Sequence, residues 1–417
     1  MIIERPYYLN KLISKRHNGM IKIVTGLRRC GKSFLLSTIY SNWLKKQGVA
    51  SDHIIDINLE DRRNKSLRNP DTLLDYIDSR IKDSDIHYVL IDEIQMVPEF
   101  EDVLNSYLNK PNVDVYVTGS NARFLSSQVR TEFAGRGDEI RLYPLTFKEY
   151  YPASGLGKEA ALKNYMIYGG LPQVVLTTSE NGKIELLKAL LERTYIRDIV
   201  LRYNVRNTEI LDETLDIIAS LIGSLTNPTK LHNTFISVKH VKVSRNTLVN
   251  YLDYFCESFL VEKATRYDIK GKKYIDTLCK YYFSDCGLRN ARLNFRQVEY
   301  THLLENVIYG ELLSRGFCVD VGVVTQYEKE DNGTRHRQYL EVDFVCNFGS
   351  RRYYIQSAYR MPDEEKLRQE EASLHRIDDS FKKIIIVGEE TPVLRTESGI
   401  SIISVYDFLL NENSLEL

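Results

Sequence analysis

The most constraining feature of this sequence is the segment from Gly26 to Ser33, which reads G-L-R-R-C-G-K-S. It completes the pattern G-x-x-x-x-G-K-[ST] and follows the mostly apolar run 20–24. A buried strand, a glycine-rich turn and a helix in this order form a phosphate-binding loop, because the loop N–H groups and the positive end of the helix surround an anion. The segment therefore predicts a nucleotide-binding α/β domain.

The residue types in this loop have distinct chemical roles. The Lys32 ammonium reaches the β- and γ-phosphates of a nucleotide, and the Ser33 hydroxyl binds the accompanying Mg²⁺. The remaining contacts come from the loop backbone. We therefore predict that ATP or GTP is held by Gly26, Leu27, Arg28, Arg29, Cys30, Gly31, Lys32 and Ser33.

A second motif supports the first one. Residues 87–91 form a mostly apolar run that ends in Asp92 and Glu93. A carboxylate at the end of a strand beside the P-loop strand orients the magnesium shell, which is the role predicted for Asp92. Glu93 is then placed to polarise the water that attacks the γ-phosphorus. The alternative is an ordinary acidic strand end, but the two motifs predict each other's context and favour the catalytic interpretation.

The composition is that of an ordinary globular protein. Of the 417 residues 27% are charged, and a formal net charge of −1 gives no general attraction to nucleic acid. No apolar run approaches the ~20 residues of a membrane span, and the first residues lack the apolar core of a signal peptide. The six cysteines include no C-x-x-C pair, which predicts reduced thiols with no disulfide framework and no zinc site. Together these features predict a cytoplasmic protein with no membrane partner.

The first of three predicted modules covers residues 1–151 and alternates strands with helices, as an open parallel sheet does. Its strands are predicted at 21–25, 53–59, 87–92, 113–118 and 139–142. The fold class is therefore expected to be α/β, with the P-loop module leading the chain.

The second module, residues 152–290, is predicted to be helical and to contain a winged-helix-like unit at about 237–275. Ser244 can cap a helix, and the positions that keep helical apolar spacing after it are Leu248, Tyr251, Leu252, Phe255 and Phe259. A strand and a basic turn at 268–273 follow this helix. This order of elements outlines a winged helix.

The winged-helix-like unit has two possible roles. In a DNA-binding version, Arg245, Asn246 and Asn250 face the groove and the lysines of the turn contact phosphates. The same helix carries Asp253 and Glu257 and has no basic stripe, which favours a packing or partner-binding module.

The third module, residues 297–417, has the predicted order helix, three strands, helix, strand, which matches the core of restriction-endonuclease-like folds. Such enzymes bind Mg²⁺ with carboxylates and use a lysine beside the attacking water. Glu305 and Asp343 are the carboxylates available here. The positions expected to hold glutamate and lysine carry Gln356 and Ala358, which are a poor Mg²⁺ ligand and no proton carrier. The sequence therefore predicts a degenerate domain without nuclease activity.

With these motifs, the chain resembles a bacterial and archaeal family of AAA+-type ATPases that carry an appended C-terminal domain of resolvase-like nuclease fold. The shared landmarks lie at 25–33, 91–95, 118–121, 135–136, 144–147, 168–172, 282–289, 304–309, 342–344 and 354–356. The resemblance implies ATP as the nucleotide, and the lack of a guanine-reading Asn-Lys-x-Asp motif agrees with it. It also implies a role in signalling, defence or DNA transactions.

Two further kinds of catalytic residue are expected in such an ATPase. A polar residue after the fourth strand senses the γ-phosphate in the AAA+ type, and Ser120 or Asn121 occupies that place, although a simple turn explains the segment equally well. An arginine can add charge at the transition state, in cis or on a neighbouring subunit, whereas a solvated surface arginine is the simpler interpretation of each one. The candidates are Arg123, Arg130 and, as the preferred one, Arg136.

The sequence thus predicts a Mg-ATP-binding switch or motor ATPase whose partner is DNA, another protein or a second copy of the chain. Two alternatives stay open. One is an ATP-gated DNA nuclease that uses Glu305 and Asp343. The other is a regulator that binds DNA or a protein and hydrolyses ATP slowly if at all.

Overall fold

The computed structural model describes residues 2–119, 135–329 and 335–417. The chain divides into two compact units, Met1–Pro144 with Glu257–Phe259, and Leu145–Cys256 with Leu260–Leu417. The predicted helical region, apart from residues 257–259, and the predicted C-terminal domain lie in the second unit. The division at 151, 290 and 297 into three modules stays a prediction.

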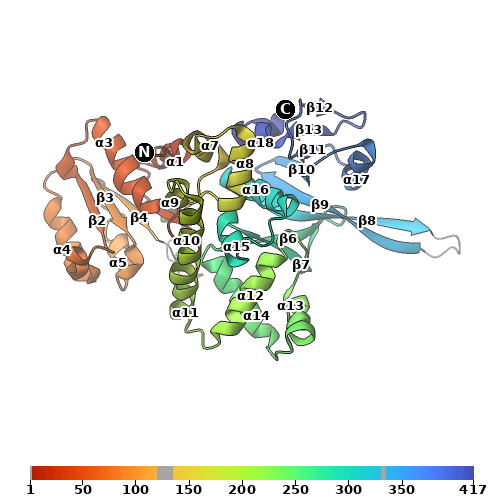
Figure 1. Cartoon of the computed structure of the whole chain (residues 1–417). Helices are drawn as coiled ribbons and strands as arrows, with labels where there is room; N and C mark the ends of the chain where they lie inside the picture. The colour runs from red at the N-terminus through yellow and green to blue at the C-terminus, as the bar shows by residue number, and fades with distance from the viewer. Residues whose placement is uncertain (1, 120–134, 330–334) are drawn as a thin grey trace. The chain divides into compact units, whose positions relative to one another are not determined.

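The first unit is an α/β domain around a parallel sheet of five strands (Figure 1). The sheet order is β2-β3-β4-β1-β5, and every neighbouring pair is parallel. The strands are β1 (Ile21–Gly26), β2 (Ile54–Asn58), β3 (His87–Asp92), β4 (Val113–Thr118) and β5 (Gly137–Leu142). The predicted α/β class and all five predicted strands are confirmed.

Helices pack on both faces of this sheet because side chains alternate along each strand. On β4, Val115 and Val117 face a core that includes apolar residues of α4 (Pro70–Arg80) and α5 (Phe100–Asn105). Tyr116 points the other way, where its ring lies 4.7 Å from that of Tyr40. Tyr40 belongs to the helical stretch that follows the P-loop, formed by α2 (Lys32–Phe34), a π-helical turn (Leu35–Tyr40) and α3 (Ser41–Lys46). The helix α1 (Pro6–Ser14) packs beside it.

The second unit begins with helices and continues into a mixed sheet. The helices before the sheet are α7 (Phe147–Ser154), α8 (Lys158–Tyr168), α9 (Pro172–Val175), α10 (Glu180–Leu190), α11 (Arg197–Tyr203), α12 (Thr208–Ser220), α13 (Pro228–Thr234) and α14 (Arg245–Glu257). As predicted, Ser244 caps α14, because its hydroxyl accepts a hydrogen bond from the Thr247 N–H at 3.0 Å. The helical character predicted for this region is thus present.

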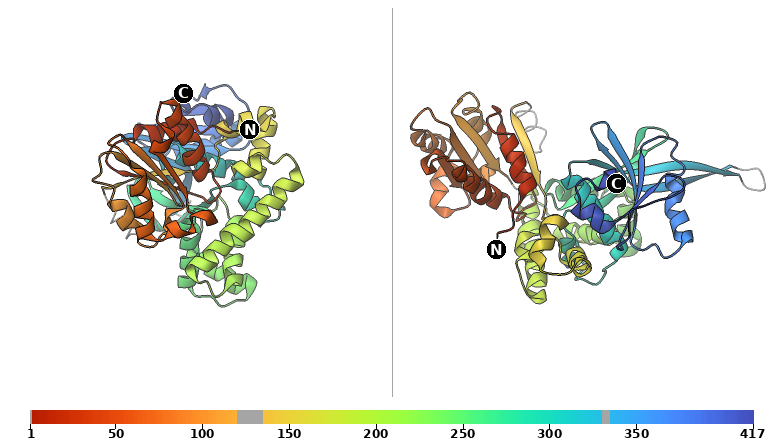
Figure 2. Two further views of the ribbon diagram at one scale, coloured as in Figure 1. Left: turned by 90° about the vertical axis from the view of Figure 1, so that its left-hand side faces the viewer. Right: turned by 90° about the horizontal axis from the view of Figure 1, so that it is seen from above.

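The sheet of the second unit has eight strands in the order β12-β13-β11-β10-β9-β8-β6-β7. They are β6 (Val261–Asp268), β7 (Lys273–Phe283), β8 (Cys318–Lys329), β9 (Arg335–Phe348), β10 (Arg351–Ala358), β11 (Lys382–Val387), β12 (Leu394–Arg395) and β13 (Ser401–Ser404). The helices around it are α15 (Cys286–Arg292), α16 (Tyr300–Ser314), α17 (Glu364–Leu374) and α18 (Val405–Leu410). Figure 2 shows the paired strands β8 and β9 running outward from this sheet. The predicted order of helix, three strands, helix and strand is present as α16, β8, β9, β10, α17 and β11.

The strand pair used in the winged-helix prediction belongs to this large sheet. The residues Arg266–Asp268 of β6 pair in parallel with Val321–Val323 of β8. The sequence predicted the helix, the strand and the basic turn, but local patterns carry no information about the pairing of that strand with one about fifty residues later. The winged-helix and restriction-endonuclease-like assignments stay predictions.

Two of the family landmarks form one buried joint in the second unit. The Asp285 carboxylate accepts hydrogen bonds from Gly170 N at 2.7 Å and from Leu288 N at 3.1 Å. Gly169 has φ +74°, and a Cβ on it would lie 2.1 Å from Asp285 Oδ1. The close packing of segment 168–172 against the start of α15 therefore requires glycine at position 169 and a carboxylate at position 285.

Among the described residues, no helix combines the length and the apolarity that a bilayer crossing requires.

Candidate nucleotide-binding site

The P-loop connects β1 to α2 with a backbone that requires its two glycines. Gly26 has φ 137° and Gly31 has φ 104°, both in the region where a side chain is strained. A Cβ on Gly26 would lie 2.1 Å from the carbonyl oxygen of Leu142 on β5. The close approach of β5 therefore excludes any side chain at Gly26, and the positive φ at the turn into the helix favours glycine at position 31.

Lys32 lies inside this loop. Its residue is 4% exposed, and its Nζ donates hydrogen bonds to the carbonyl oxygens of Gly26 and Leu27, each at 3.0 Å. Ser33 follows at the start of α2 and is exposed. The ammonium and the hydroxyl thus stand at the amino end of a helix, where an anion is favoured.

The other loop residues are held by the protein around them. Leu27 and Cys30 are buried, and burial raises the pKa of the Cys30 thiol although Lys32 and Arg5 oppose that shift. Arg28 forms an ion pair with Glu60 at 2.9 Å. Arg29 has φ 65° and faces outward.

Arg5 supports the loop from outside it. Its guanidinium is buried and donates to the carbonyl oxygens of Cys30 at 3.3 Å, Tyr143 at 2.9 Å and Pro144 at 3.4 Å. It thereby joins the start of α1, the P-loop and the chain after β5. Sequence reasoning missed this residue because nothing near Arg5 in the sequence marks a partner twenty-five residues away.

The acidic pair lies at the end of β3, which is separated from the P-loop strand β1 by β4. The predicted arrangement, with the Asp92 strand directly beside the P-loop strand, is wrong, because β4 lies between β3 and β1. The end of β4 supplies Thr118, whose hydroxyl donates to Asp92 Oδ1 at 2.6 Å and accepts from Glu93 N at 2.9 Å. Parallel strands end at the same edge, so the acidic pair still lies on the P-loop side of the sheet.

Burial raises the pKa of Asp92, and hydrogen bonds from Thr118 and Ser33 oppose that shift. Ser33 is thus close enough to Asp92 to oppose the rise in its pKa, which places the two predicted magnesium residues near each other. Glu93 is only 7% exposed, has φ 57°, and its carboxylate accepts a hydrogen bond from the amide of Gln95. Asp92 of β3, Thr118 of β4 and Ser33 of α2 therefore converge at this edge, as a metal-phosphate site requires.

The predicted sensor and finger residues are placed differently. Ser120, Asn121, Arg123 and Arg130 lie outside the described residues. Arg136 is exposed, and its carbonyl oxygen accepts from the N–H of Ile21, the first residue of β1, at 2.9 Å. The P-loop begins at the other end of β1, about 17 Å away at the rise of a strand. The structure thus does not bring Arg136 to the nucleotide site of its own chain, and a role on a neighbouring subunit stays a prediction.

A second cluster of charged side chains lies in the other unit. Lys280 of β7 has a side chain that is 2% exposed, and its Nζ lies 2.7 Å from Glu305 Oε1, 2.6 Å from Glu341 Oε1 and 3.6 Å from Asp343 Oδ1. Burial alone would lower the pKa of Lys280, but the three carboxylates raise it. Burial also raises the pKa of Glu305, against the opposing effect of Lys280. The structure therefore brings together the two predicted carboxylates and a lysine that the motif comparison had not considered.

Gln356, at the position predicted to be degenerate, lies next to this cluster. Its Oε1 accepts from Asp343 N at 2.7 Å, and Asp343 Oδ2 accepts from Ser357 N at 2.9 Å. These bonds hold the Asp343 carboxylate in place between two strands. Ala358 is buried two residues further along β10.

The residues predicted to contact DNA are on the surface. Arg245, Asn246 and Asn250 are exposed on α14, and so are Asp253 and Glu257 of the same helix. Lys272 and Lys273 at the turn between β6 and β7 are exposed too. Both sets of side chains are therefore accessible from solvent.

Comparison with known proteins adds the family. Residues 18–151 match a family described as an AAA domain, and residues 159–299 match one described as a domain of unknown function. A protein of Haemophilus influenzae, described as uncharacterized, is 35% identical over 98% of this chain and 99% of its own length. The chain belongs to the same family as this protein. An uncharacterized protein of Methanocaldococcus jannaschii is 29% identical over 86% of this chain and 79% of its own length.

In this chain, the match to an AAA domain covers the P-loop and the acidic pair, and the match at 159–299 assigns no role. Among solved structures, the Orc1 protein of Aeropyrum pernix in complex with DNA is 13% identical over 70% of this chain and 93% of its own, with a TM-score of 0.28. The replication initiator DnaA bound to AMPPCP and single-stranded DNA is 13% identical over 60% and 86%, with a TM-score of 0.31. Likeness at this level carries no argument about function.

Proposed function

We propose that this member of the family binds Mg-ATP at the P-loop and hydrolyses it, as a nucleotide-dependent switch or motor. The observation that carries the proposal is the convergence of Lys32, Ser33, Asp92 and Glu93 at one edge of the sheet, with Thr118 joining the acidic pair. Lys32 and Ser33 hold the phosphates and the metal, Asp92 orders the metal shell, and Glu93 activates water. The metal belongs to the bound nucleotide.

Replacing Lys32 by alanine tests the binding half of this proposal. The variant is expected to bind Mg-ATP roughly 10- to 100-fold more weakly than the wild type, because a charge-assisted contact to phosphate is lost. Calorimetric titration with Mg-ATP measures the difference. Lys46→Ala, at the exposed end of the same helical stretch, is the matched control and should bind as the wild type does.

An unchanged affinity in Lys32→Ala, in a variant that melts like the control, would overturn the proposal. Loss of affinity in both variants would have the same consequence, because the effect would then not come from the P-loop.

A second candidate function is metal-dependent DNA cleavage by the cluster around Lys280. The specific observation in its favour is that a buried lysine from β7 lies among Glu305, Glu341 and Asp343, although the usual lysine position holds Ala358. Three carboxylates and one ammonium leave a surplus of negative charge that a divalent cation can neutralise. The sequence alone predicted no nuclease activity, because the position expected to hold lysine carries Ala358.

Asp343→Asn tests this candidate. The wild type is expected to cleave at least one of single-stranded, double-stranded or branched DNA in Mg²⁺ or Mn²⁺, and the variant to lose that activity at least ~100-fold because a metal ligand is gone. Glu364→Gln, an exposed change on α17, is the matched control. If the wild type cleaves none of these substrates, the cluster is an ion network that holds α16 against the sheet.

A further inference from the structure

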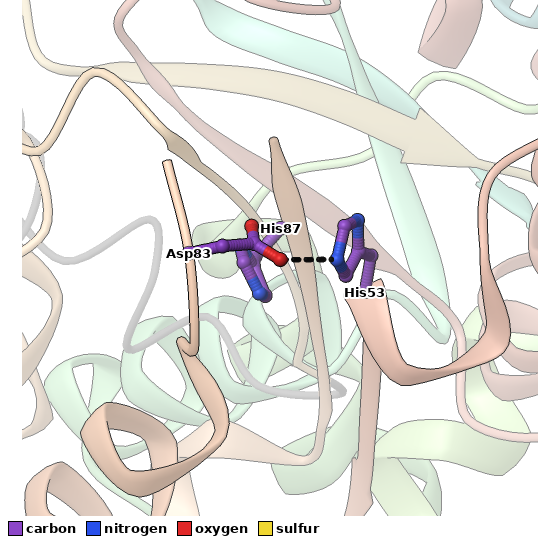
Figure 3. A group of neighbouring side chains, drawn as sticks. All are labelled: His53, Asp83 and His87. Atoms are coloured by element: carbon purple, nitrogen blue, oxygen red, sulfur yellow. Dashed lines mark hydrogen bonds and ion pairs between the residues drawn. The ribbon is translucent and has the colours of Figure 1, made fainter. Parts of the chain in front are cut away.

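Two histidines and an aspartate gather in the first unit, away from the P-loop (Figure 3). His53 ends the short 3₁₀ turn Ser51–His53 before β2, His87 is the first residue of β3, and Asp83 lies in the connection between α4 and β3. The P-loop follows the carboxyl end of β1, whereas this group stands at the amino ends of β2 and β3. The two sites are therefore at opposite edges of the same sheet.

The ligand atoms of the group are close together. One donor atom from each side chain lies within 4.8 Å of the other two, and His53 Nε2 is 3.1 Å from Asp83 Oδ2. Metal–ligand bonds of 2.0–2.1 Å in a tetrahedron place ligand atoms about 3.3 Å apart. The His53–Asp83 separation already fits that value, and the remaining gap of up to roughly 1.5 Å can close because the Asp83 side chain is 49% exposed.

His87 is prepared for the role of a ligand by its second contact. Its Nδ1 lies 2.8 Å from the carbonyl oxygen of Asp85, which can only accept, so Nδ1 carries the proton and Nε2 carries the free lone pair. Metal-ligating histidines commonly use such a carbonyl to fix the ring and its tautomer. His87 is fully buried, and its Nε2 has no hydrogen-bond partner among the described residues.

A simple surface ion pair accounts for only part of this arrangement. It explains why Asp83 lies beside His53, whose side chain is 16% exposed. It does not explain a buried nitrogen acceptor without a donor, which costs free energy unless a partner arrives. A cation held by all three side chains satisfies that nitrogen and the carboxylate together.

We propose that His53, Asp83 and His87 bind a divalent transition-metal ion of the Zn²⁺ class, with the fourth position open to water. Imidazole ligands favour such ions over Mg²⁺ and Ca²⁺, which prefer an all-oxygen shell. The cysteine pattern of the sequence had indicated that no zinc site exists, but these ligands are histidine and carboxylate. The bound ion ties together the turn before β2, the connection after α4 and the start of β3, and so braces the sheet edge opposite the nucleotide.

The test uses full-length protein without a histidine tag, stripped of metal and nucleotide. The wild type is expected to bind one Zn²⁺ per chain in a chelator-competition titration, to give the visible absorption of tetrahedral Co²⁺, and to melt at a higher temperature with Zn²⁺. His53→Ala and Asp83→Ala should each lose at least ~10-fold in Zn²⁺ affinity. Both replace side chains that are not deeply buried, so folding is expected to survive.

Two matched controls separate this site from other ligands. Asp85→Ala removes an exposed carboxylate two residues from Asp83 and leaves the backbone carbonyl that contacts His87. His240→Ala removes an exposed histidine from the other unit. Both should bind Zn²⁺ as the wild type does. The proposal is overturned if the wild type binds no Zn²⁺, or if His53→Ala and Asp83→Ala bind it as tightly as the controls.

Discussion

Glu93→Gln is expected to bind Mg-ATP about as tightly as the wild type and to hydrolyse it roughly 100- to 10,000-fold more slowly, the usual effect of losing a general base. The substitution keeps the size and the hydrogen-bonding shape of the side chain. It removes the carboxylate that polarises water, while the backbone N–H of residue 93 still donates to Thr118. Steady-state phosphate release measures turnover, and calorimetry measures affinity.

The matched control is Glu99→Gln, an exposed glutamate in the same stretch of chain. It should leave both turnover and affinity unchanged. If Glu93→Gln turns over ATP at the wild-type rate, Glu93 does not activate the water. If it loses affinity as well, the residue acts in binding and the assignment of roles at this edge of the sheet is wrong.

Asp285→Ala is expected to lower the free energy of unfolding of the second unit by about 3–5 kcal/mol at pH 7, because at least two buried N–H groups lose their acceptor. The partners are the N–H groups of Gly170 and Leu288, so the joint between 168–172 and α15 opens. Denaturant unfolding followed by circular dichroism measures the loss. Asp363→Ala is the matched control, since Asp363 also caps a helix, α17, but is exposed and should cost only about 1 kcal/mol.

The same carboxylate predicts a pH dependence. Burial raises the pKa of Asp285 from 3.8 to about 6, against the hydrogen bonds that its backbone partners donate. A raised folded-state pKa contributes stability that is fully present below pH 3.8 and is lost as the pH rises through about 6. Asp285→Asn cannot titrate, so its unfolding free energy should lack this decline. A decline of the same size in Asp285→Asn would assign the effect to other groups.

Local patterns in the sequence predicted much of this fold. All five strands of the first unit and the run from α16 to β11 come from apolar periodicity, which reflects nearest-neighbour packing. The P-loop was equally predictable, because its complete motif lies within eight residues, although the close approach of Leu142 to Gly26 comes only from the fold. What failed was pairing between distant segments. The spacing of residues along the chain does not show that β4 lies between β1 and β3. It does not show where β6 and β7 lie in the large sheet either.

The candidate sites follow the same rule. Asp92 and Glu93 were found because an acidic pair ends an apolar run, whereas Thr118 and Arg5 act through partners that only folding brings near. Lys280 was missed for a related reason, since the motif comparison looked for a lysine on β10 and the fold supplies one from β7. Residues whose role depends on tertiary contacts lie beyond the reach of pattern reasoning.

The most direct measurement is steady-state Mg-ATP hydrolysis by the wild type and Glu93→Gln, each with and without single- and double-stranded DNA. The account predicts turnover in the wild type that vanishes in the variant. A hydrolysis rate that rises with DNA would support DNA as the partner of the exposed residues of α14. A rate that DNA does not change would favour a protein partner. Binding without turnover under every condition would leave a nucleotide-gated switch. A wild type that neither binds nor hydrolyses Mg-ATP would contradict the central claim.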